Sequence, residues 1–130
     1  MTYPNERPEA YVLRRVEAAV VDGVEALRGR CHAVTAPAPA ETETESRFCV
    51  YAATGGKLTP SPAFRHGAPA TRSFRVTVAA AQFSAARAAA DAVMESIEKG
   101  GRLVNGTGPV DSYDSGQEVF QRAVVVEIAV

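Results

Sequence analysis

The sequence predicts an α+β fold in which two helices pack on one face of a mainly antiparallel sheet, and one hairpin of that sheet carries a long arm. Two segments repeat apolar residues every three or four positions, and several short segments are β-branched or alternate apolar with polar residues. A stretch rich in glycine and proline separates two of these short segments. The predicted order is helix, short strand, two strands, helix and two strands. A chain of 130 residues has room for one hydrophobic core, so we expect one domain over residues 1–130.

The first predicted helix runs from Pro8 to Leu27. Pro8 suits a first turn, where a missing N–H costs little, and Arg28 with Gly29 suits the end. The residues expected on its buried stripe are Val12, Leu13, Val16, Ala19, Val20, Val24 and Leu27.

Two predicted strands lie on either side of the long arm. Phe48–Ala52 has the aromatic and β-branched composition of a buried strand, and Ser73–Ala79 alternates apolar with polar residues. Between them, Thr54–Thr71 is rich in glycine and proline, and irregular segments of this length are uncommon unless they bind something or are disordered. We therefore expect an antiparallel hairpin with a long arm at its tip. The preceding segment, Thr35–Ser46, is predicted to be a surface loop or a sheet edge.

The rest of the chain predicts a second helix and two strands. Ser84 is the expected N-cap of a helix over Ala85–Lys99, which ends at Gly100 or Gly101. Its expected apolar stripe consists of Ala86, Ala89, Ala90, Val93, Met94 and Ile97.

A strand that begins at Leu103 is expected to be interrupted by turns at Asn105–Pro109 and Asp111–Gly116. The last strand, Phe120–Val130, is apolar on both faces, which is typical of a central or covered strand. One face is expected to carry Val124, Val126, Ile128 and Val130, and the other Ala123, Val125 and Ala129.

The overall composition excludes several classes of function. A formal net charge of −1 gives no field that would hold nucleic acid through its phosphates. The N-terminal segment lacks the basic start and apolar run of a secretory signal, and no apolar stretch approaches the length of a membrane span. We expect a protein of the cytoplasm that does not bind membranes, in which Cys31 and Cys49 are reduced and packed.

The sequence predicts no catalytic residue, no metal site and no cofactor. His32 and His66 have no carboxylate or cysteine at a metal-ligand spacing. The TGGK segment, Thr54–Lys57, lacks the upstream glycine and the following Ser or Thr of a phosphate loop. Asp111, Asp114 and Glu118 do not have the spacing of a calcium loop.

Two groups of residues are candidates for contacts with partners. The arm carries basic, aromatic and titratable side chains that we expect at an interface: Lys57, Phe64, Arg65 and His66. The acidic run contains Glu41, Glu43 and Glu45 on alternate positions. The simpler interpretation of this run is a solvated edge that discourages strand pairing. The alternative is the wall of a lumen through which DNA slides.

Four segments together resemble the tail-terminator and tail-completion proteins of long-tailed phages and gene-transfer particles. They are the N-terminal helix, the strands FCVYA and ATRSFRVTVAA, the helix SAARAAADAVMESIEKG, and the closing GRLVNGTGPVDSYDSGQEVFQRAVVVEIAV. In that family a similar strand is followed at once by a similar helix and then by a final hairpin with an apolar last strand. The resemblance covers nearly the whole chain and consists of element order and hydrophobicity, not of an invariant motif.

The resemblance implies a structural virion protein without catalytic residues or cofactors. It implies a homohexameric ring that binds the head-proximal end of the tail tube, stops its polymerisation and enables head attachment. The implied partners are other copies of the chain, the tail tube protein and the head–tail connector protein, with DNA only as passing cargo. The implied location is the virion, after assembly in the host cytoplasm. The alternatives are a head–tail neck or other minor tail protein, and a small ligand-binding or enzymatic domain that uses the TGGK segment on an anion.

Overall fold

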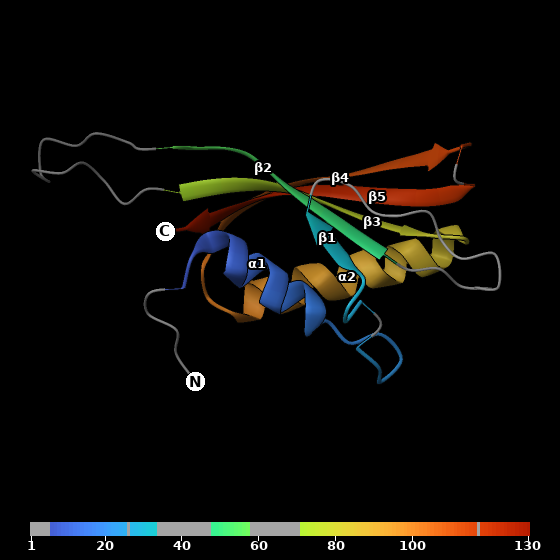
Figure 1. Ribbon diagram of the computed structural model, residues 1–130, viewed down its shortest axis with the longest axis horizontal. Coiled ribbons are helices and arrows are strands. Elements are labelled where there is room, and N and C mark those ends of the chain that lie inside the picture. The colour runs from blue at the N-terminus through green and yellow to red at the C-terminus, as the bar shows by residue number, and fades with distance from the viewer. Residues whose placement is uncertain (1–5, 26, 34–47, 58–70, 117) are drawn as a thin grey trace, which may run out of the picture.

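The computed structural model describes residues 6–25, 27–33, 48–57, 71–116 and 118–130, and for residues 33 and 48–57 it describes the backbone. The elements are α1 (Pro8–Glu17), β1 (Cys31–Ala33), β2 (Phe48–Lys57), β3 (Thr71–Ala80), α2 (Phe83–Lys99), β4 (Leu103–Asp114) and β5 (Val119–Ala129). They form a five-stranded sheet in the order β1-β2-β3-β5-β4. β1 is parallel to β2 and the other pairs are antiparallel. Both helices lie on one face of the sheet (Figure 1), so the predicted fold class is confirmed.

The core lies between α2 and the two central strands, β3 and β5. Their register pairs Phe74 with Val126 and Val76 with Val124, and all four side chains are buried. The alanines of α2 leave little side-chain bulk, so this helix packs directly on both strands. The predicted buried faces of α2, β3 and β5 are thus confirmed, except at Met94, which is only partly buried, and at Val130. This residue follows the end of β5 and is exposed.

The first helix is much shorter than predicted. α1 ends at Glu17, and the chain then makes a two-residue turn in which Val21 and Val24 exchange backbone hydrogen bonds of 2.8 and 3.0 Å. Asp22 and Gly23, at the centre of this turn, have φ of 53° and 79°, which a helix does not allow. The helical spacing of the valines beyond Glu17 was therefore misleading: Val20 and Val24 are exposed.

The start of the second helix also differs from the prediction. Phe83 is its first residue and Gln82 occupies the N-cap position, so Ser84 lies inside the first turn. No side chain caps this end, but the Ala86 N–H donates to the Gln82 carbonyl oxygen at 3.1 Å. The predicted end is confirmed, since Gly100 is the C-cap.

Two strands continue through segments that were predicted to be irregular. β2 extends through the TGGK segment to Lys57, because its backbone pairs with β3 as far as Thr71. The register shifts between Ala53 and Gly55. Glycine is common at such irregularities within a strand.

Likewise β4 runs unbroken to Asp114, so the predicted turn at Asn105–Pro109 is wrong. The register against β5 shifts between Thr107 and Val110, so the glycine and proline are accommodated as a bulge. The hairpin turn lies just after β4, where the Gly116 N–H donates to Asp114 Oδ1 at 2.9 Å.

Candidate assembly surface

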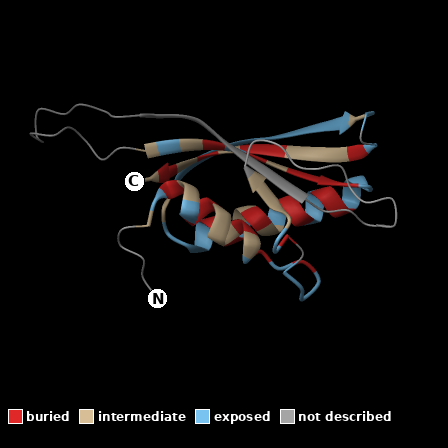
Figure 2. Ribbon diagram, viewed as in Figure 1, coloured by how far each residue is buried: buried red, intermediate tan, exposed pale blue. Residues whose placement is uncertain are grey.

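β4 is an edge strand that water reaches on both faces. Every residue from Val104 to Tyr113 is exposed, whereas the residues of the neighbouring β5 are buried or partly buried (Figure 2). The helix layer does not cover β4, because α2 packs on β3 and β5. Large apolar side chains are consequently left in water: Val104 is 57% exposed, Val110 62% and Tyr113 53%. Val110 pairs with Ala123 and Tyr113 pairs with Phe120, three positions along the strand, so these two side chains lie on opposite faces of the sheet. We call Val104, Val110 and Tyr113 the β4 surface.

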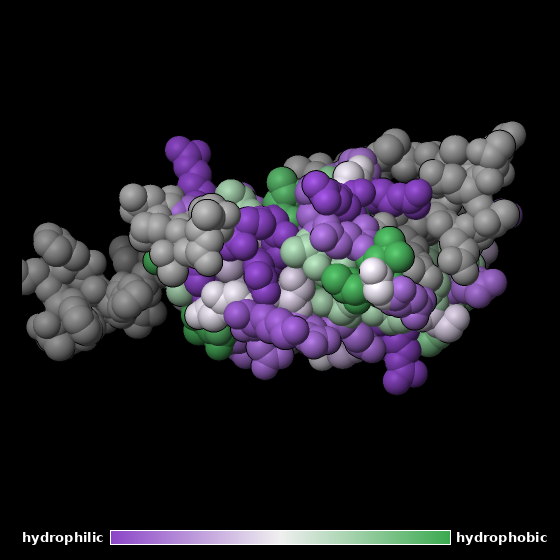
Figure 3. All heavy atoms as spheres, turned by 90° about the horizontal axis from the view of Figure 1, so that it is seen from below, coloured by the Kyte–Doolittle hydropathy of each residue, from purple (hydrophilic) through white to green (hydrophobic). Residues whose placement is uncertain are grey.

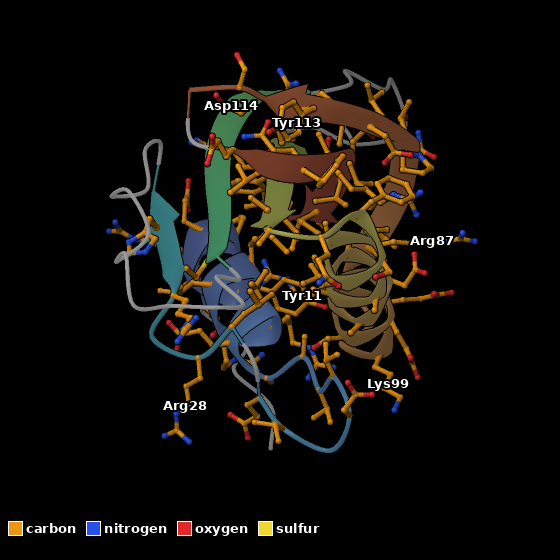
Figure 4. The ribbon with its side chains drawn as sticks, turned by 90° about the vertical axis from the view of Figure 1, so that its right-hand side faces the viewer. Tyr11, Arg28, Arg87, Lys99, Tyr113 and Asp114 are labelled. Atoms are coloured by element: carbon orange, nitrogen blue, oxygen red, sulfur yellow. The ribbon has the colours of Figure 1, made fainter. Side chains whose placement is uncertain are left out.

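An aromatic cluster forms one end of the β4 surface. The rings of Tyr113 on β4 and Phe120 on β5 have centroids 4.9 Å apart, and the Phe83 ring of α2 lies 6.1 Å from that of Phe120. The second pair meets edge to face, which is a favourable arrangement for aromatic rings. Tyr113 and Asp114 lie on the opposite side of the molecule from Arg28 and Lys99 (Figure 4). The cluster therefore gives the β4 surface a partly exposed aromatic end.

Arg122 fixes the position of β4 relative to α2. Its Nε and Nη2 donate to the two carboxylate oxygens of Asp111 at 2.7 and 3.1 Å, and its Nη1 lies 3.5 Å from Asp91 on α2. The guanidinium carbon is also 5.9 Å from the centre of the Phe83 ring. The hydrogen bonds from Arg122 hold the pKa of the Asp111 carboxyl below its usual range, so this carboxyl keeps its charge at a more acid pH than a free aspartate does.

A shallow hollow of about 170 Å³ lies between α2 and β4. Val124, Met94 and Pro109 contribute apolar walls, and Asp91 and Arg122 lie at its border. Two of the lining residues are glycines, and a Cβ on Gly106 would lie 3.4 Å from the Met94 methyl group. The hollow thus exists because β4 has no side chain at these positions.

A second hollow, of about 290 Å³, lies between the end of α1 and the second half of α2. Its basic residues make contacts at its rim: Arg15 Nε donates to the Ser96 carbonyl oxygen at 2.6 Å, and Lys99 lies 3.7 Å from Glu95. The Ser96 hydroxyl donates in return to the Arg15 carbonyl oxygen at 2.5 Å. The surface of the helix layer is mainly hydrophilic, with separate apolar side chains (Figure 3). The two hydrogen bonds between Arg15 and Ser96 join α1 to α2.

The residues predicted from sequence to contact partners are not the ones that form the β4 surface. Lys57 is the last residue of β2 and its backbone pairs with Thr71, while its side chain is outside the described part. The other predicted residues also lie outside it: Phe64, Arg65, His66, Glu41, Glu43 and Glu45. Sequence reasoning missed the β4 surface because the glycines, prolines and aspartates around it predicted turns. The only signal was the apolar character of Val104, Val110 and Tyr113 among these residues.

Within the described ranges, no three His, Cys, Asp or Glu side chains are grouped so that they could hold a metal ion. In the same ranges no helix has the length and apolar character needed to cross a membrane.

Comparison with known proteins finds no family model and no curated protein that matches this chain. The features of this chain that bear on its function are therefore the order of its elements and the β4 surface.

Proposed function

We propose that this chain is a ring-forming subunit that caps the head-proximal end of a phage tail tube, ends tube polymerisation and enables head attachment. The observation that carries the proposal is the exposure of β4 on both faces, with Val104, Val110 and Tyr113 in water. An edge strand that leaves several large apolar side chains in water is a candidate for a protein–protein interface. In an assembled ring these side chains would be covered by the next subunit.

A ring requires a heterologous contact, in which one surface of a subunit meets a different surface of its neighbour. The β4 surface is proposed as one half of this contact. We expect side-chain packing there in place of a continuous sheet between subunits. Pro109 has no N–H to donate, and the bulge between Thr107 and Val110 interrupts the ladder. Asp111 and Asp114 place like charges on the same strand, which also discourages direct strand addition.

The proposed partners are other copies of the chain, as a homohexamer, together with the tail tube protein and the head–tail connector protein. The proposed location is the virion, and the proposed role is structural, without catalytic activity. The acidic run with Glu41, Glu43 and Glu45 stays a candidate for the lumen, where negative charge would let DNA pass without binding.

The first test is the mass of the purified chain by light scattering over a range of concentrations, followed by negative-stain imaging with tail tubes. We expect a six-fold mass, or rings that appear only at tube ends. A monomer that leaves tube ends bare at every concentration would contradict the proposal.

The same surface would also serve a head–tail neck subunit, so a second experiment separates the two roles. Deletion of a terminator gives overlong tails, whereas deletion of a neck subunit leaves tails of normal length and filled heads that are not joined. We expect overlong tails from a phage that lacks this chain.

A further inference from the structure

The two cysteines of the chain are brought together by the pairing of β1 with β2. They are its only cysteines, and they are far apart in the sequence. In the parallel pair β1–β2, Cys31 and Cys49 are Cα partners, followed by His32 with Val50 and Ala33 with Tyr51. The fold therefore places the two cysteines at the same register position on neighbouring strands.

This register is compatible with a covalent bond between them. Neighbouring strands lie roughly 4.8 Å apart, and disulfides join residues whose Cα atoms are roughly 4.4–6.8 Å apart. Register partners also lie on the same face of a sheet, and the next residue along the strand lies on the other face. A cysteine placed at position 32 would therefore lie on the face of the sheet opposite to Cys49.

Cys31 is a free thiol that solvent can reach. It lies on a three-residue strand at the edge of the sheet, is only partly buried, and packs against the core. The backbone of Cys49 lies on β2, which has a neighbouring strand on each side, and its side chain is outside the described part.

We propose that Cys31 and Cys49 form a disulfide between β1 and β2 when the chain meets a low-molecular-weight disulfide such as glutathione disulfide. The Cys31 thiolate attacks one sulfur of the reagent, which gives a mixed disulfide and releases one glutathione thiolate. The Cys49 thiolate then attacks the Cys31 sulfur and releases the second glutathione thiolate. Each cysteine loses one proton to solvent, and the reagent is reduced to two thiols.

The bond would anchor β1, which is held to the sheet by β2 alone. It would also close the chain from Cys31 to Cys49 into a covalent loop that contains Glu41, Glu43 and Glu45. Closing a loop lowers the entropy of the unfolded chain, so the oxidised protein is expected to unfold at a higher temperature. This inference does not depend on the proposed function, because it uses only the register of β1 and β2.

The test is to equilibrate the folded, full-length chain with mixtures of glutathione and glutathione disulfide, and then to measure intact mass and thermal unfolding. We expect a species that has lost two hydrogen atoms, resists alkylation and contains a Cys31–Cys49 peptide in a digest. Its Tm should exceed that of the reduced chain by about 5 °C or more. The matched control is the double variant Cys31→Ser/His32→Cys, which moves the thiol by one residue. It should accumulate mixed disulfides with glutathione and no internal bond.

Three results would overturn the proposal. One is a wild-type chain that carries glutathione on both cysteines under conditions that favour internal bonds. A second is a disulfide-linked dimer as the main product on a non-reducing gel. The third is a control variant that forms an internal bond as readily as the wild type, since that would mean the β1–β2 register is not what brings the thiols together.

Discussion

Gly100 is the C-cap residue of α2, and the side chain of Tyr11 from α1 packs against it. The Tyr11 hydroxyl donates to the Ile97 carbonyl oxygen at 2.7 Å, and a Cβ on Gly100 would overlap this hydroxyl and the edge of the ring. Tyr11 is fully buried, so it has no open space to move into. We expect Gly100→Ala to lower the free energy of unfolding by about 1–3 kcal/mol, as overpacking does. Urea unfolding would measure this.

The matched control for Gly100→Ala is Gly106→Ala. A Cβ at Gly106 would lie 3.4 Å from the Met94 methyl group, which is an ordinary contact, and β4 is exposed there. This variant should change stability by less than about 0.5 kcal/mol. Equal losses from the two variants would mean that the overlap with Tyr11 is not the cause.

Arg102 joins the two ends of the described chain. Its Nε and Nη2 donate to the Ala129 carbonyl oxygen at 3.0 and 2.6 Å, and its Nη1 donates to the Glu6 carbonyl oxygen at 2.9 Å. The guanidinium carbon also lies 5.0 Å from the centre of the Tyr11 ring. We expect Arg102→Ala to destabilise the fold by about 1.5–3 kcal/mol, because hydrogen bonds from a charged donor are lost. Arg102→Lys should retain only part of the lost stability, because lysine lacks the planar guanidinium that donates several hydrogen bonds at once.

Arg87→Ala is the control for Arg102→Ala. Arg87 is exposed on α2 and points into solvent (Figure 4). Its removal should shift Tm by only a degree or two, within about 0.5 kcal/mol. A comparable loss of stability in both variants would contradict the role of Arg102 at the chain ends.

The Glu6–Arg14 pair makes stability depend on pH. Arg14 donates to both oxygens of the Glu6 carboxylate at 2.9 Å, and these hydrogen bonds, with the nearby positive charges, lower the pKa of Glu6. Because the folded pKa is below the unfolded one, the stabilisation is complete above roughly pH 4.3, the unfolded value, and is lost as pH falls through the folded pKa. Glu6→Gln should therefore flatten the loss of stability below about pH 4.5.

Urea unfolding at a series of pH values would check this expectation. In an Arg14→Met background, the further change Glu6→Gln should flatten the pH profile less than it does in the wild type, because only the charges of Arg102 and Arg15 still lower the pKa of Glu6. Equal flattening in the two backgrounds would mean that Arg14 does not lower this pKa.

At the scale of the elements, the turn at Asp22 and Gly23 prevents the first helix from continuing to Leu27. Asp22 and Gly23 both have positive φ, and a Cβ on Gly23 would meet nothing within 4 Å. In Gly23→Ala the only strain would therefore come from the positive φ of the backbone, and we expect the free energy of unfolding to fall by about 1 kcal/mol. Asp22→Asn should be neutral or slightly stabilising, because Asn-Gly is the favoured pair for such a turn. Thermal unfolding of both variants would test this, and a neutral Gly23→Ala would argue for a continued helix.

At the scale of the whole molecule, the β4 surface is expected to act in association and not in folding. Val110 is 62% exposed, so Val110→Asp should change the stability of the monomer by less than about 0.5 kcal/mol. It should nevertheless abolish ring formation, because an unpaired carboxylate would be buried in the contact. Light scattering and negative-stain imaging with tail tubes would show the loss.

Val20→Asp is the matched control, since Val20 is 54% exposed but lies after α1, away from β4. Rings should persist in this variant. If both variants form rings like the wild type, the β4 surface is not part of the interface.

Much of the fold was predictable from local patterns. The alternation of Phe74, Val76 and Val78 and the alanine stripe of α2 correctly identified buried faces, because burial on one face imposes a period of two or near 3.6 on the sequence. The Gly100 stop was also correct, since it depends on local backbone geometry.

Some segments have local sequence preferences that oppose the structure they adopt. For these segments only the tertiary structure determined the result. Asn105–Pro109 contains residues that favour turns, yet it stays in β4 because pairing with β5 supplies hydrogen bonds on either side of a bulge. Helical spacing predicted Val20 and Val24 to be buried, but the Asp22–Gly23 turn ends that pattern. The β4 surface and the Cys31–Cys49 register likewise arise from contacts between distant segments. The sequence by itself thus determined the fold class and most of the core. Which strand became the exposed edge, and which residues it offers to a partner, depended on the long-range order of the strands in the sheet.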